Sequence, residues 1–205
     1  MWIKICGLTS PEDAALALTL GADAIGINFV PASRRYVEPE LAERVLEPVR
    51  GKLELVGVVA DLGLAELEAL QRRFNLDWLQ LHGNEPPELL RQLPHAFKAL
   101  GIAGPDDVER SSHFAGRRLL VDKKASGVQG GTGQAFDWSL VTGLAREREL
   151  VLAGGLNPDN VERAIAAVSP FGVDVASGVE LAGNARKKDP ERMAAFIARA
   201  RASRP

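Results

Sequence analysis

The chain has 205 residues, a hydrophobic content of 46% and a formal net charge of -2, the composition of an ordinary globular protein. This charge offers no basic face for nucleic acid, and no apolar run approaches the roughly 18 residues of a membrane-spanning helix, so neither partner is expected. One cysteine cannot form an internal disulfide, and Met1–Lys4 leads straight into a strand-like segment without a secretory leader, so a cytoplasmic protein is expected.

Short apolar or β-branched runs alternate with longer amphipathic runs along the whole chain. The apolar runs predict eight strands, at Ile3–Cys6, Ala24–Phe29, Glu54–Val59, Trp78–Leu81, Phe97–Leu100, Leu119–Val121, Leu150–Ala153 and Gly172–Val175. The amphipathic runs predict eight helices, at Pro11–Leu20, Pro39–Val49, Leu64–Phe74, Pro86–Leu93, Pro105–Ser112, Trp138–Ala145, Pro158–Val168 and Pro190–Ala202. No change of composition marks a linker between them.

Three helix starts carry capping signatures. A polar residue precedes proline at Ser10-Pro11, Asn157-Pro158 and Asp189-Pro190, and acidic residues follow in the first turn. The polar side chain can accept a backbone N–H, and proline fits the first helical position because its missing N–H is not needed there.

Strict alternation of strands and helices requires a parallel sheet, either open and doubly wound or closed into a barrel. Two features favour closure. Eight strands close a barrel that side chains can fill, and the loop after the first strand, "CGLTSPED", lacks the G-x-G-x-x-G motif of a dinucleotide-binding sheet. We therefore predict one α/β domain over residues 1–205, a (β/α)8 TIM barrel.

Chemistry in such a barrel lies at the carboxyl ends of the strands. Glycine pairs or Ser-Gly follow the seventh and eighth strands, at Gly154, Gly155, Ser177 and Gly178. The open backbone amides at these two loops form the recurrent phosphate site of the fold, although glycines also serve tight turns without any ligand. Two such loops in the two expected places favour a phosphate site.

Asp122 ends the sixth strand and precedes a glycine-rich loop through Gly127, Gly130, Gly131 and Gly133. A loop this long inside a compact repeat is more often functional than not. The carboxylate could pair with a neighbouring lysine, but at a strand end it is also a plausible general acid or base.

Three further side chains have candidate roles. Arg34 and Arg35 follow the second strand, where a guanidinium could bind a substrate carboxylate instead of lying solvated on the surface. His82 could be a catalytic base or an inner hydrogen-bonding residue, and its spacing leaves both open. One cysteine and three scattered histidines give no zinc cluster, so no metal is expected.

Taken together, six motifs in order resemble the phosphoribosylanthranilate isomerases, the (β/α)8 enzymes of the tryptophan pathway. The likeness runs nearly end to end, through "KICGLTSPEDA", "GADAIGINFVPASRRYV", "LQLHGNE", "LLVDKK" with "GGTGQAFDW", "AGGLNPDNV", and "GVDVASGVE" followed by "KKD".

The resemblance implies an Amadori rearrangement of the phosphosugar N-(5'-phosphoribosyl)anthranilate, with no metal, nucleotide or organic cofactor. By the family pattern Asp122 is the general acid that opens the ribose ring, and Cys6 is the general base that removes the proton from carbon 2. Arg35 aligns with the arginine that holds the anthranilate carboxylate, and Gly154, Gly155, Ser177 and Gly178 fall at the phosphate-binding amides. A thiol with a pKa near 8.5 needs only a modest shift to act near neutrality.

This sequence departs from the family in two places. Ala176 stands where many relatives have a second serine, and "LAGNARKKD" is longer and more basic than the usual link after the eighth strand. The second departure bears on the local loop and on oligomer contacts, so a monomer and a homodimer are both open.

Two rival functions remain open. The related histidine-pathway sugar isomerase runs the same rearrangement, but an aspartate holds the position of Cys6 in that family. A phosphosugar-binding barrel without catalysis would keep the glycine loops, but it would not need both Cys6 and Asp122.

Overall fold

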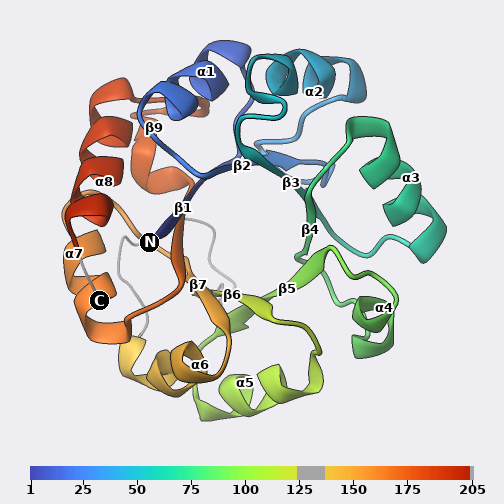
Figure 1. Cartoon of the computed structure of the whole chain (residues 1–205), viewed down its shortest axis with the longest axis vertical. Helices are drawn as coiled ribbons and strands as arrows, with labels where there is room; N and C mark the ends of the chain where they lie inside the picture. Colours follow the sequence, from blue (N-terminus) through green and yellow to red (C-terminus); the bar gives the residue numbers. More distant parts are fainter. Residues whose placement is uncertain (124–136, 204–205) are drawn as a thin grey trace.

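A computed structural model of the chain describes residues 1–123 and 137–203. Eight parallel strands close into a barrel in chain order, and this confirms the predicted (β/α)8 fold (Figure 1). The strands are β1 (Trp2–Cys6), β2 (Ala24–Asn28), β3 (Glu54–Val59), β4 (Trp78–Leu81), β5 (Ala96–Ile102), β6 (Arg118–Lys123), β7 (Glu149–Leu152) and β8 (Gly172–Val175). The pairing of β1 with β8 closes the ring.

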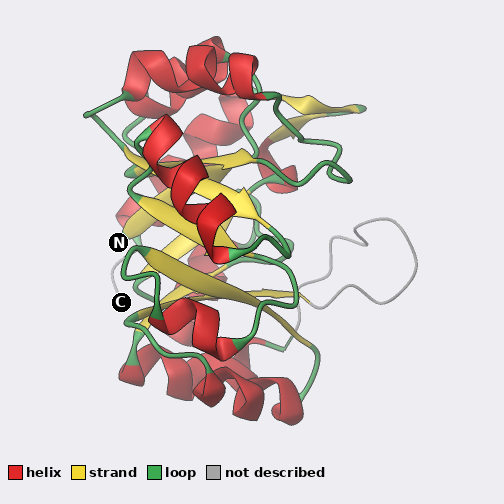
Figure 2. Cartoon of the chain, turned by 90° about the vertical axis from the view of Figure 1, so that its right-hand side faces the viewer, coloured by secondary structure: helices red, strands yellow, loops and turns green. Residues whose placement is uncertain are grey.

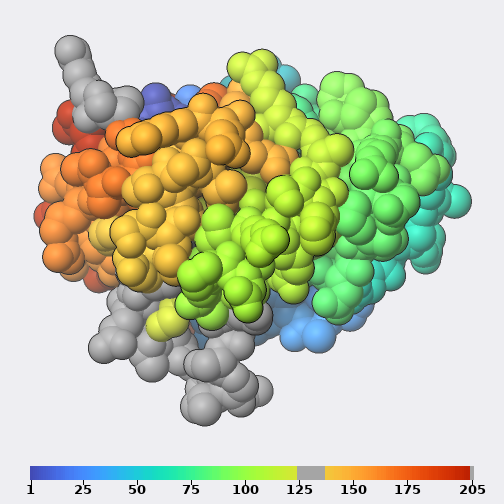
Figure 3. Space-filling view, turned by 90° about the horizontal axis from the view of Figure 1, so that it is seen from below, coloured from blue at the N-terminus to red at the C-terminus, as the bar shows by residue number. Residues whose placement is uncertain are grey.

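The helices form an outer ring around the barrel (Figure 1). They are α1 (Pro11–Thr19), α2 (Pro39–Leu46), α3 (Leu64–Phe74), α4 (Pro87–Arg91), α5 (Pro105–Arg110), α6 (Thr142–Glu147), α7 (Val161–Val168) and α8 (Pro190–Ala202). Short 3-10 turns, η1 (Glu47–Val49), η2 (Ser111–His113), η3 (Trp138–Val141) and η4 (Ser177–Val179), accompany them. The main hydrophobic core lies between this ring of helices and the barrel. The segments of α4, α5 and α6 lie side by side on the outer surface of the molecule (Figure 3).

Two of the three predicted helix caps are confirmed. The Ser10 hydroxyl accepts the backbone N–H of Asp13, and the Asp189 carboxylate accepts two N–H groups of the first turn of α8. The third is confirmed only in part: the Asn157 side chain accepts the backbone N–H of Asp159 at 2.8 Å, but a turn follows and α7 begins at Val161 with Asn160 as its N-cap. There the Asn160 side chain accepts the backbone N–H of Asn157 and so stabilises the turn in place of the helix.

The longer and more basic segment after β8 forms a small antiparallel hairpin, which the sequence patterns did not predict. Its strands are β9 (Glu180–Leu181) and β10 (Asn184–Lys188), with Gly183 at a positive φ of 77° between them. Figure 2 shows this hairpin at the end of the barrel opposite the two chain termini. The extra basic residues of "LAGNARKKD" therefore build a structure at the mouth of the barrel.

The amino end of the barrel is filled around Arg118, whose side chain is 6% exposed. Its guanidinium pairs with Glu149 at 3.3 Å and with Glu54 at 3.1 Å. It also lies within 4.4–5.9 Å of the centroids of four aromatic rings, those of Trp2, Trp78, Phe97 and Phe171. Ion pairs to two carboxylates and cation–π contacts to four rings together hold this arginine in place.

Candidate functional site

The carboxyl end of the barrel gathers the candidate residues around one mouth. Cys6 is the last residue of β1, His82 follows β4, and Asp122 is the last but one residue of β6. In the closed order β7 and β8 separate β6 from β1, so Cys6 and Asp122 approach the mouth from well-separated strands. A general acid and a general base on two sides of a bound sugar require this separation.

Lys4 is a buried cation on β1 that the motif analysis did not identify. It is fully buried, and its ammonium donates to the Gln80 side-chain oxygen at 2.9 Å and to Asp174 at 2.8 Å. Side chains two residues apart on a strand face the same side, so Lys4 and Cys6 both face the barrel interior. The signal in the sequence is a lysine within the apolar run "WIKIC".

The absence of a side chain at Gly26 on β2 makes room for both groups. A Cβ atom at this position would lie 2.9 Å from the Cys6 sulfur and 3.2 Å from the Lys4 nitrogen. The sulfur and the ammonium therefore converge on the same space beside Gly26. Any larger residue at this position would displace one of them.

The electrostatics of Cys6 differ from the expected modest adjustment toward neutrality. Burial raises the pKa of the Cys6 thiol, because it penalises the thiolate. The ammonium groups of Lys4 and Lys188 oppose this rise, while Asp174 adds to it. Burial acts to lower the pKa of Lys4, because it penalises the ammonium. The Asp174 carboxylate and the Cys6 sulfur outweigh this effect of burial, so the pKa of Lys4 is raised. The two lysines are thus the groups that favour the thiolate.

The contacts of Lys4 also determine the protonation of His82. An ammonium only donates, so the Gln80 atom beside it is the oxygen, and the other Gln80 atom is the amide nitrogen. That nitrogen donates to Nδ1 of His82 at 3.1 Å. The imidazole therefore carries its proton on Nε2. Burial lowers the pKa of His82 despite the opposing charge of Asp122, which favours this neutral form.

Asp122 lies where its proton is retained more readily than in water. Burial raises the pKa of the carboxyl; His82 opposes the rise and Asp174 adds to it. A Cβ atom at Gly154 would lie 2.8 Å from an Asp122 oxygen, and Gly154 has a φ of 83°. Glycine at this position therefore permits both the turn and the approach of the loop after β7 to the acid.

The two predicted phosphate loops lie against each other. A Cβ atom at Gly178 would collide with the backbone oxygen of Leu156, so the turn that carries Ser177 and Gly178 packs directly on the loop after Gly155. The Asn160 side chain donates to the Gly155 oxygen at 2.9 Å and stabilises this loop. The close packing brings the predicted residues of the two loops into one place.

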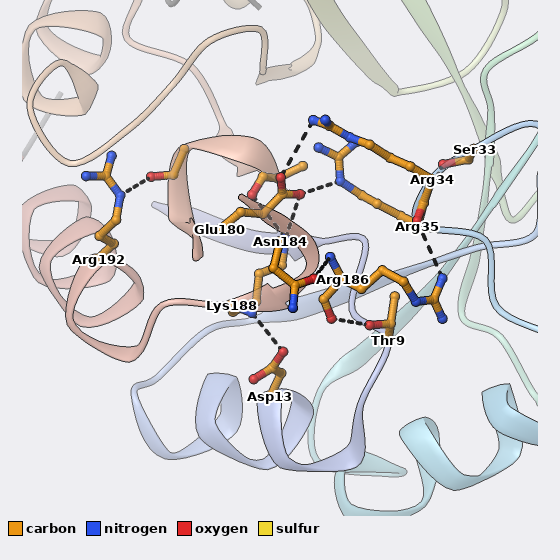
Figure 4. Close-up of polar contacts among 12 residues, drawn as sticks. Thr9, Asp13, Ser33, Arg34, Arg35, Glu180, Asn184, Arg186, Lys188 and Arg192 are labelled. Atoms are coloured by element: carbon orange, nitrogen blue, oxygen red, sulfur yellow. Dashed lines mark hydrogen bonds and ion pairs between the residues drawn. The ribbon is translucent and has the colours of Figure 1, made fainter. Parts of the chain in front are cut away.

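Arg35 lies over the start of the loop after β1. A Cβ atom at Gly7 would collide with the Arg35 stem, so the arginine lies over the residue that follows Cys6 in the chain. Its Nε donates to Glu180 at 2.5 Å, and Glu180 also lies 3.6 Å from the ammonium of the buried Lys188 (Figure 4). Glu180 and Lys188 belong to the family motifs "GVDVASGVE" and "KKD", but no local pattern links them to the arginine.

Two other expectations concern ligands and membranes. In residues 1–123 and 137–203 no group of three or more His, Cys, Asp or Glu side chains could hold a metal ion. In the same parts of the chain every helix is too short or too polar to cross a bilayer. The predicted glycine-rich loop with Gly127, Gly130, Gly131 and Gly133 lies outside the described residues.

Comparisons with known proteins agree along the whole chain. Residues 3–199 match the family model described as N-(5'phosphoribosyl)anthranilate (PRA) isomerase. The chain is 40% identical to the N-(5'-phosphoribosyl)anthranilate isomerase of Geobacter sp. (strain M21), with 97% of both proteins covered.

Two solved structures of this kind are also similar. One is a crystal structure of monomers generated from the dimeric phosphoribosylanthranilate isomerase of Thermotoga maritima. It has a TM-score of 0.85 and 38% identity, with 98% of this chain and 99% of that chain covered. A phosphoribosylanthranilate isomerase in complex with reduced 1-(o-carboxyphenylamino)-1-deoxyribulose 5-phosphate has a TM-score of 0.86, 38% identity and the same coverage.

Proposed function

The chain belongs to the N-(5'-phosphoribosyl)anthranilate isomerase family, and we propose that Cys6 and Asp122 carry out its reaction. The enzyme converts N-(5'-phosphoribosyl)anthranilate to 1-(2-carboxyphenylamino)-1-deoxyribulose 5-phosphate in tryptophan biosynthesis. The assignment rests on 40% sequence identity to such an isomerase over 97% of the chain. The placement of a thiol and a carboxyl at the ends of two well-separated strands supports the two catalytic roles.

Asp122 is the general acid of the first step. It donates its proton to the ring oxygen of the ribose while the bond from carbon 1 to that oxygen breaks, and the nitrogen lone pair forms a C=N bond to carbon 1. The raised pKa of Asp122 supports this role, because a carboxyl that keeps its proton nearer neutrality has one to give. Nε2–H of the neutral His82 is a second donor at this side of the mouth.

Cys6 is the general base of the second step. Its thiolate removes the proton from carbon 2, and the electron pair moves through carbon 1 to the nitrogen to give an enolamine. Tautomerisation then turns the carbon 2 hydroxyl into a ketone and places a proton on carbon 1. Hydrogen is redistributed within one molecule, so the reaction needs no external oxidant, as expected for a cofactor-free enzyme. Lys4 and Lys188 favour the reactive thiolate.

The two charged groups of the substrate bind on different sides of the barrel mouth. Arg35 binds the anthranilate carboxylate, and the amides around Gly154, Gly155, Ser177 and Gly178 bind the phosphate. The positions support this division, since Arg35 lies over Gly7 in the loop after β1, whereas the glycine loops follow β7 and β8.

The test is an activity assay on both candidate substrates side by side. Purified protein should abolish the fluorescence of phosphoribosylanthranilate as it is consumed, and it should act far more slowly on the histidine-pathway substrate. Unchanged fluorescence with a folded protein would reject the assignment. A faster reaction with the second substrate would favour the related isomerase instead.

We further propose a cytoplasmic enzyme that is a monomer or a homodimer. A similar Thermotoga maritima enzyme is described as dimeric, which makes the dimer the first state to test. Light scattering on the purified chain measures the mass directly, and a value near 22.0 kDa would identify the monomer.

A further inference from the structure

We propose that Glu180, at the start of the β9–β10 hairpin, is a positioning residue that aims the Arg35 guanidinium at the carboxylate of the substrate. The inference rests on the proposed role of Arg35 and extends it to the hairpin. It makes the segment after β8 a determinant of specificity for a carboxylated aromatic amine (Figure 4).

The contact between Glu180 and Arg35 involves only one edge of the guanidinium and leaves the edge with the two terminal nitrogens for a ligand. Glu180 accepts from Nε of Arg35 at 2.5 Å, so the carboxylate occupies the side of the guanidinium. The two terminal nitrogens lie on another edge of the same rigid plane, and this edge matches a second carboxylate through two parallel hydrogen bonds. A single anchor at Nε therefore determines where that edge points.

The Glu180 carboxylate, which anchors Arg35, is buried and lies against a second buried residue, Lys188. The Glu180 side chain is only 8% exposed, and the ammonium of the buried Lys188 lies 3.6 Å from the oxygen that accepts from Arg35. Lys188 is held in turn, because its backbone N–H donates to Asp13 at 2.9 Å and its ammonium donates to the Ala176 oxygen at 3.0 Å. Glu180 thus has little freedom to move with Arg35.

The hairpin also clamps the loop that carries Arg35. Arg186 on β10 donates to the backbone oxygen of Tyr36 at 2.8 Å and to that of Arg34 at 3.4 Å. The Thr9 hydroxyl donates to the backbone oxygen of Arg186. Loops after β1 and β2 are therefore joined through β10, and Arg35 is held by its own side chain and by the backbone of its two neighbours.

The charges of this cluster suit an anionic ligand. Arg35 and Lys188 lie within 3.6 Å of the single Glu180 carboxylate, and Asp13 binds the Lys188 backbone. The Arg186 guanidinium donates to a backbone oxygen of the loop that carries Arg35 and adds a third cation. The three cations exceed the two nearby carboxylates, so positive charge remains at the mouth. A benzoate group would neutralise it, and because the Arg35 stem lies over Gly7, that group would bind next to the loop that follows Cys6.

The experiment compares two stable ligands whose only difference is the carboxylate. One is reduced 1-(o-carboxyphenylamino)-1-deoxyribulose 5-phosphate, and the other is the same molecule with an unsubstituted phenyl ring. Calorimetry on the full chain gives the ratio of the two dissociation constants, the carboxylate preference. Arg35→Ala should reduce this preference about 10- to 100-fold, the value of hydrogen bonds to a charged group.

Glu180→Ala should reduce the preference nearly as much as Arg35→Ala, and with phosphoribosylanthranilate it should raise KM more than it lowers kcat. Glu180→Gln should keep most of the preference, because its amide oxygen still accepts from Nε. Arg186→Ala should give a smaller loss in the same direction. Arg34→Ala is the matched control: its side chain is 65% exposed and 3.7 Å from Glu180, so we expect less than about a twofold change.

The outcomes separate this inference from the proposed function. An unchanged preference in Arg35→Ala would reject the role of Arg35 and, with it, the role of Glu180. A loss in Arg35→Ala with no loss in folded Glu180→Ala would overturn the role of Glu180 alone. Equal losses in Glu180→Ala and Glu180→Gln would assign the effect to charge and overturn positioning. If Glu180→Ala does not fold, an unchanged preference in Arg186→Ala overturns the role of the hairpin.

Discussion

Two arginines, at opposite ends of the barrel, show what each end does. Arg118 at the amino end is enclosed by four aromatic rings and paired with Glu54 and Glu149. Arg35 at the carboxyl end is anchored by Glu180 at one edge and remains 18% exposed. A cation enclosed by aromatic rings and paired with two carboxylates stabilises the fold, whereas a cation anchored at one edge can still bind a ligand. Changes at the mouth should therefore alter activity, and changes at the amino end should alter stability.

The largest expected effect lies at the mouth. Cys6→Ser and Asp122→Asn should each lower turnover by about 10²–10⁴-fold, because each removes a positioned acid or base. Both variants should still bind the reduced product, and their free energy of unfolding should stay close to that of the parent. Near-normal turnover in either variant would remove that residue from the mechanism.

The next largest effect lies at the amino end. Arg118→Met should lower the free energy of unfolding by about 3 kcal/mol, because it leaves Glu149 and Glu54 without their cation and removes the cation–π contacts. Urea titration measures this loss, and the turnover of the folded variant should be unchanged. A large loss of turnover with intact stability would contradict the contrast between the two ends.

A smaller effect concerns the charge on Cys6. Lys4→Met should raise the pKa of the thiol, since the ammonium of Lys4 opposes the effect of burial, and Asp174→Asn should lower it. Cys6 is the only cysteine, so the ultraviolet absorbance of the thiolate reports on it alone. Cys6→Ser provides the blank. The same titration curve in Lys4→Met and the parent would show that Lys4 does not act on the sulfur.

The smallest expected effect is a pH dependence of stability. The pKa of His82 is lower in the folded protein than its ordinary value of 6.5, so the unfolded chain binds more protons below that pH. The free energy of unfolding should therefore fall as the pH falls below about 6.5. His82→Gln should flatten this slope in urea titrations between pH 5 and pH 8 (roughly). A slope that persists in this variant would assign the effect to another group.

Sequence reasoning recovered features that depend on neighbouring residues. Apolar runs and capping residues located all eight strands and most helix starts, and β3, β4 and β8 have the predicted bounds. The positions of Cys6 and Asp122 at strand ends followed from the same local pattern. Local signals identified the capping side chain of Asn157 but placed the helix start too early, because a turn with a contact between Asn160 and Asn157 precedes α7.

The partners of the buried charges were decided only by the tertiary structure. Lys4 meets Asp174 from 170 residues away, and Arg35 meets Glu180 from 145 residues away. Closure of β1 onto β8 brings the first pair together, and the hairpin after β8 brings the second. A strand pattern shows which residues face inward, but it does not show which strand lies opposite. The sequence by itself therefore determined the barrel and the strand-end positions of the proposed acid and base, while the folded chain determined which charged groups lie beside them.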